Sequence, residues 1–121
     1  MINTLLCWLR WRKNPYRQTV ETHREEIRLI EVAGRILEPH ASGPGLQKLQ
    51  EVKASLTRLK AQLCWVKNVA LDAFDPRVDR FSSYALNQKA GVIDHLNSQL
   101  EKIRQELAAL AEAMDCLDLS S

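Results

Sequence analysis

The sequence predicts an all-α protein: an antiparallel, up-down-up three-helix bundle with coiled-coil-like seams, plus a short N-terminal helix. Three observations lead to this prediction. Leu, Ala, Glu, Lys, Arg and Gln dominate, and only four glycines and four prolines occur among 121 residues, which is typical of long helices. Most glycines and prolines gather at a few breaks. Between these breaks, apolar residues recur every three or four positions, the period of one helix face.

The first segment, residues 1–14, is predicted to be a short helix that is both apolar and basic. Six of residues 5–12 are apolar, and no acidic residue occurs before position 21. A helical conformation separates two groups of large side chains: Leu5, Leu6 and Leu9 on one side, Trp8 and Trp11 on the other. A helix that is apolar on two sides is usually buried between two surfaces. We therefore expect the leucine side to dock on the bundle and the tryptophans to meet a partner.

Three breaks divide the rest of the chain. Asn14 and Pro15 are a capping residue followed by proline at the first helical position. The run EPHASGPG ends one helix and starts the next at Pro44. Asp75 and Pro76 repeat the pattern of the first break. These breaks give the predicted organisation: a short N-terminal helix in residues 1–14 and a bundle in residues 15–121, with helices at about 15–38, 45–74 and 83–117.

Each long helix is predicted to carry one apolar seam with alternating spacings of three and four, typical of helices that pack nearly antiparallel. His23, on the first seam, is expected to be a core or subunit-contact histidine. The third helix is the longest, and Met114 and Leu117 near its end favour contact with another chain or with another segment. The expected seams are Val20, His23, Ile27, Ile30, Gly34 and Leu37; Leu49, Val52, Leu56, Leu59, Leu63, Val66, Ala70 and Ala73; and Ile93, Leu96, Leu100, Ile103, Leu107, Leu110, Met114 and Leu117.

Basic residues suggest two interpretations of the second helix. Lys53, Lys60 and Lys67 recur every seven residues beside its seam, and such a row can follow the phosphates of a nucleic acid. Glu26, Glu31 and Glu38 flank the first seam and could instead pair with the lysines. Both interpretations stay open. The candidate nucleic-acid-binding residues are Arg10, Arg12, Lys13, Arg17, Lys53, Arg58, Lys60 and Lys67.

The sequence predicts no catalytic residue, no metal ligand and no cofactor. Cys7, Cys64 and Cys116 are far apart and form no CxxC pair, which favours reduced thiols in a cytoplasmic protein. A di-iron bundle needs Glu-x-x-His on two helices, and neither His23 nor His95 has a glutamate three residues before it. The few glycines offer no phosphate-binding loop.

These observations predict a non-enzymatic protein that binds a macromolecule: an adaptor, a regulator or inhibitor, or a small subunit of a larger complex. The expected partner is another protein or a second copy of the chain. The alternative is a nucleic-acid-binding accessory protein that uses the N-terminal Trp/Arg segment and the lysine row. Peripheral attachment to a membrane is disfavoured, because a membrane-surface helix gathers its tryptophans with its leucines. The candidate partner-binding residues are Trp8, Arg10, Trp11, Arg12, Lys13 and Trp65.

Overall fold

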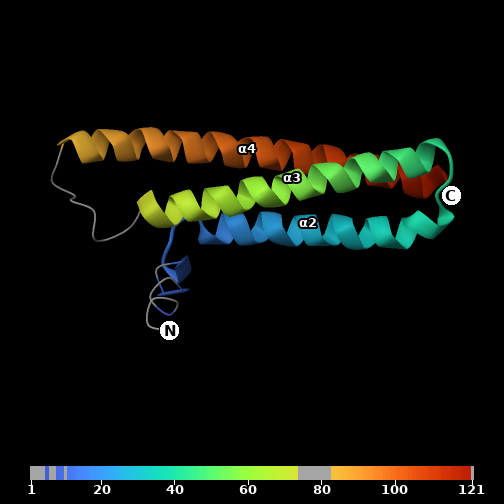
Figure 1. Cartoon of the computed structure of the whole chain (residues 1–121), viewed down its shortest axis with the longest axis horizontal. Helices are drawn as coiled ribbons and strands as arrows, with labels where there is room; N and C mark the ends of the chain where they lie inside the picture. The colour runs from blue at the N-terminus through green and yellow to red at the C-terminus, as the bar shows by residue number, and fades with distance from the viewer. Residues whose placement is uncertain (1–4, 6–7, 10, 74–82, 121) are drawn as a thin grey trace.

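The computed structural model describes residues 5, 8–9, 11–73 and 83–120, and it confirms the predicted fold class. Three helices run alternately up, down and up (Figure 1). They are α2 (Arg17–Leu37), α3 (Pro44–Ala73) and α4 (Ser83–Ser120), with a 3-10 turn at Glu38–His40 between the first two. Each helix packs against the other two, and the described residues form no strand.

The helix boundaries lie close to the predicted ones, but the predicted cap of the first helix is wrong. Helix α2 begins at Arg17, and its N-cap residue is Tyr16, without a side-chain cap. Asn14 precedes a turn instead: its Oδ1 accepts a hydrogen bond from the backbone N–H of Tyr16 at 2.9 Å. Pro44 is the first residue of α3, as predicted. It follows Gly43, whose positive φ of 58° favours glycine. The predicted break at residues 75–76 lies outside the described residues.

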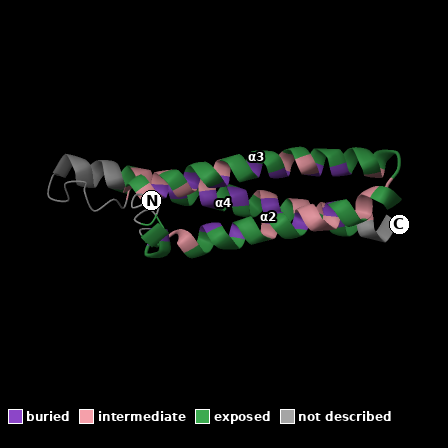
Figure 2. Ribbon diagram, turned by 60° about the horizontal axis from the view of Figure 1, so that its bottom comes forward, coloured by how far each residue is buried: buried purple, intermediate pink, exposed green. Residues whose placement is uncertain are grey.

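The core follows the three predicted seams. Figure 2 shows the buried residues along the inner sides of the helices. Five of the six seam residues of α2 and seven of the eight seam residues of α3 are buried, the last residue of each being half-buried. His23 is among the buried ones. Between residues 90 and 117, where burial on α4 is described, the buried apolar positions are Leu96, Leu100, Ile103, Leu107 and Met114.

Segments of the same chain cover the end of the third helix, which is one of the two options predicted from the sequence. Met114 is buried, and the half-buried Leu117 packs against the core of the same chain. Helix α4 instead extends past the other two helices at its N-terminal end (Figure 1). The C-terminal part of α4 therefore completes the bundle, because it lies beside the end of α2 and the start of α3.

Candidate functional site

The N-terminal segment, which the structure describes at residues 5, 8–9 and 11–14, is held at the end of the bundle where α2 begins and α3 ends (Figure 1). Trp11 is only 7% exposed, and the ammonium of Lys67 lies 5.0 Å from its ring centroid. Asn14 is also buried, and its Nδ2 donates a hydrogen bond to the backbone carbonyl of Ala70 at 3.1 Å. Trp11 and Asn14 therefore anchor the segment to the last turns of α3.

Three apolar side chains of this segment face solvent. Leu5 is 57% exposed, Trp8 54% and Leu9 39%. All three residues are helical, and their spacing of three and four places them on one face. We call these three residues the N-terminal stripe. Arg12 follows one turn later, with its guanidinium carbon 5.4 Å from the ring centroid of Trp8. Arg12 and Lys13 are both exposed.

The expectation that the leucine side docks on the bundle is therefore wrong for Leu5 and Leu9, while Leu6 lies outside the described residues. The buried residue of the segment is Trp11, while Leu5 and Leu9 point outward. Trp11 offers the larger apolar area to bury, and Lys67 covers its ring. Trp8 lies three residues after Leu5 and shares the exposed face with the leucines. Trp11 is thus a core residue in this structure. The candidate contact Arg10 lies outside the described residues.

The lysine row on α3 is arranged as a flank of the bundle. The Nζ of Lys53 lies 2.8 Å from a carboxylate oxygen of Glu38, and Lys60 forms an ion pair with Glu31. The third member of the row, Lys67, contacts the Trp11 ring. Two further candidate nucleic-acid-binding residues also have carboxylate partners: Arg58 pairs with Glu106 on α4 and Arg17 with Glu21.

Trp65 lies on α3 and contacts α4 through His95. It is exposed, and its ring packs edge-to-face against His95 with centroids 5.3 Å apart. His23 is buried, and its Nδ1 has no hydrogen-bond partner within the described part of the chain. The nearest carboxylate oxygen, on Glu26, lies 3.6 Å from this nitrogen.

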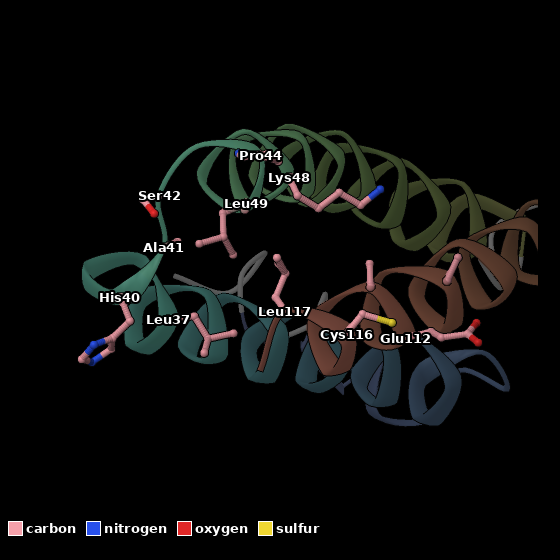
Figure 3. Close-up of a pocket in the computed structure, with 13 residues that line it drawn as sticks. Leu37, His40, Ala41, Ser42, Pro44, Lys48, Leu49, Glu112, Cys116 and Leu117 are labelled. Atoms are coloured by element: carbon pink, nitrogen blue, oxygen red, sulfur yellow. The ribbon is translucent and has the colours of Figure 1, made fainter. Parts of the chain in front are cut away.

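A hollow of about 840 Å³ lies at the opposite end of the bundle, between the start of α3 and the end of α4. Leu49 and Leu117 point into it, whereas His40 points away (Figure 3). Lys48, Glu112 and Cys116 contribute its polar groups. Over the described ranges, no three His, Cys, Asp or Glu side chains group closely enough to hold a metal ion.

Two exposed apolar residues on α2 were missed by the sequence analysis. Leu29 and Ile36 are exposed, and they lie seven residues apart, off the seam of their helix. The sequence could have indicated these two residues, because positions outside the core face of a bundle helix are usually polar and Leu29 and Ile36 are apolar. Their exposure makes them useful controls for the N-terminal stripe.

Comparison with protein-family models, with curated proteins and with solved structures gave no match. Among the described helices, none combines the length and the apolar character needed to cross a membrane. Function must therefore be inferred from the side chains of the described residues.

Proposed function

We propose that the protein is a non-enzymatic binding protein, in which the three-helix bundle holds the N-terminal segment against a larger partner. The observation that carries this proposal is the exposure of the N-terminal stripe, Leu5, Trp8 and Leu9. These side chains add little to the stability of the bundle while they remain in water. Contiguous exposed apolar side chains often mark an interaction site, and Trp is enriched among the residues that dominate binding energy.

The anchoring of the segment supports the same proposal. Trp11 and Asn14 fix the segment on α3, so the stripe is held in one orientation before a partner arrives. Such preorganisation lowers the entropic cost of binding. An adaptor, a regulator or a small subunit of a larger complex would each use a surface of this kind. Widely spaced cysteines, two of which are exposed and free, support a reducing compartment such as the cytoplasm.

The nucleic-acid alternative has less support on α3 than in the N-terminal segment. Lys53, Lys60 and Arg58 already have carboxylate partners. Trp8 could stack on a base while Arg12 contacts a phosphate, as in single-strand-binding proteins. A gel shift with a short single strand at low and high salt tests this alternative, because phosphate contacts weaken steeply as salt is added.

Site-specific photo-crosslinking in cells tests the main proposal. A benzoyl-phenylalanine residue replaces Trp8 in the full-length protein, and a matched control places it at Ile36, which is 64% exposed on α2. We expect the stripe position to cross-link to one class of macromolecule much more than the control. Treatment with protease, nuclease or lipid extraction then identifies the class. Equal labelling at both positions, or none at either, would contradict the proposal.

A further inference from the structure

The N-terminal stripe lies in a stretch of excess positive charge. Residues 1–17 contain four basic and no acidic residues. The first carboxylate along the chain, that of Glu21, pairs with Arg17 at 3.2 Å. Within the described part of the chain, no acidic side chain forms an ion pair with Arg12 or Lys13. The exposed apolar side chains therefore stand beside two cations that have no carboxylate partner among the described residues, which favours an anionic partner.

The side chains of the N-terminal stripe and of the neighbouring Arg12 and Lys13 match the chemistry of a bilayer interface, which is apolar at the acyl chains and charged at the headgroups. Leu5 and Leu9 supply apolar groups, and Trp8 has the amphipathic ring that is enriched where headgroups meet acyl chains. The guanidinium of Arg12 lies near the Trp8 ring. An arginine in that position can lay its apolar stem along the stripe while its charged end stays at the phosphates.

The size of the stripe favours lipid over a second copy of the chain. A stable protein interface engages about 20–30 residues on each side, whereas the stripe offers three apolar side chains and two neighbouring cations. A lipid surface needs no matching pocket, because binding there depends on buried apolar area and on attraction between cations and anionic headgroups. The sequence-based reason for disfavouring a membrane also fails for Trp8, which shares its face with the leucines.

We infer that the partner of the N-terminal stripe is the surface of an anionic lipid bilayer. Leu5, Trp8 and Leu9 enter the boundary between headgroups and acyl chains, while Arg12 and Lys13 contact the headgroup phosphates. Trp11 and Asn14 keep the segment attached to the bundle, which remains in water. This inference rests on the proposed function, since both require the stripe to be the contact surface.

Vesicle flotation with the full-length protein tests the inference. We expect the protein to float with vesicles of phosphatidylcholine and phosphatidylglycerol but not with phosphatidylcholine alone, and to be released by high salt as the charges are screened. Trp8→Gln combined with Leu9→Gln should abolish flotation. Arg12→Gln and Lys13→Gln should each weaken binding about fivefold. The matched control Ile36→Gln should bind like the unmodified protein.

Thermal melting of each variant shows whether the fold is retained, and we expect it to be, because every substituted side chain is exposed. Equal flotation with both vesicle types, or unchanged flotation of the stripe variant, would overturn the inference. If no vesicle binds while position 8 still cross-links preferentially to protein or nucleic acid, the lipid inference fails and the proposed function stands. If neither flotation nor preferential cross-linking is seen, both fail.

Discussion

Replacing Trp11 by Ala should destabilise the protein far more than replacing Trp8 by Ala. Trp11 is buried and Trp8 is about half exposed, although both are tryptophans in the same segment. Removing a buried Trp side chain costs about 3–5 kcal/mol, and we take the lower figure because Trp11 lies at the edge of the core. Exposed substitutions usually change stability by no more than about 0.5 kcal/mol.

The expected shifts follow from the size of the chain. Unfolding entropy near the melting temperature is about 2.1 cal/mol/K per residue, which gives about 0.25 kcal/mol/K for 121 residues. Trp11→Ala should therefore lower the melting temperature by about 12 °C, and Trp8→Ala by about 2 °C at most. Circular dichroism at the helical minimum measures both melts. Equal shifts for the two variants, or a negligible shift for Trp11→Ala, would refute the assignment of Trp11 as the anchor.

Four further predictions follow from individual contacts. Asn14→Ala should cost about 1–3 kcal/mol in chemical denaturation, because it removes a buried hydrogen bond to the Ala70 carbonyl and a half-buried one from the Tyr16 N–H. Lys60→Glu should cost less than about 1 kcal/mol in the same assay, because its ion pair on α2 is partly exposed. The hydrogen bond from Arg104 lowers the pKa of Glu101. The stabilisation from this pair is therefore present above the pKa of Glu101 in the unfolded chain, and it is lost as the pH falls through the lower pKa of Glu101 in the folded protein. NMR titration of the Arg104→Gln variant should show a higher pKa for Glu101. Leu59→Asp places an unpaired charge at a fully buried position and should abolish the cooperative melt.

The seams of the bundle could be predicted from sequence because their spacing is dictated by packing. A residue such as Leu56 or Leu107 is buried because a strict three-four alternation keeps it facing the neighbouring helices. The ion pairs of Lys53 with Glu38 and of Lys60 with Glu31 also agree with one of the two predicted interpretations of the lysine row. They follow from the same register, because residues that flank one seam lie opposite residues that flank the next.

The orientation of the N-terminal segment could not be predicted in the same way. In a segment of about two turns, spacing alone does not say which face is buried. The deciding contacts join distant parts of the chain: Trp11 with Lys67, and Asn14 with Ala70, which lies 56 residues further along. Helix-capping statistics suggested a local role for Asn14, but its amide group instead bridges a local turn and the end of α3.

The anchor and the stripe belong to the same short segment, so one determines the orientation of the other. Trp11 faces inward, while Trp8 and Leu9, three and two residues earlier, face outward. Losing the anchor would therefore also release the stripe from its fixed orientation, and binding would then include the entropic cost of ordering the segment. Trp11→Ala should for this reason weaken vesicle binding as well as stability, whereas Trp8→Ala should weaken binding alone. A Trp11→Ala protein that melts earlier yet binds vesicles with full affinity would show that the stripe acts as a flexible arm and that the bundle does not orient it.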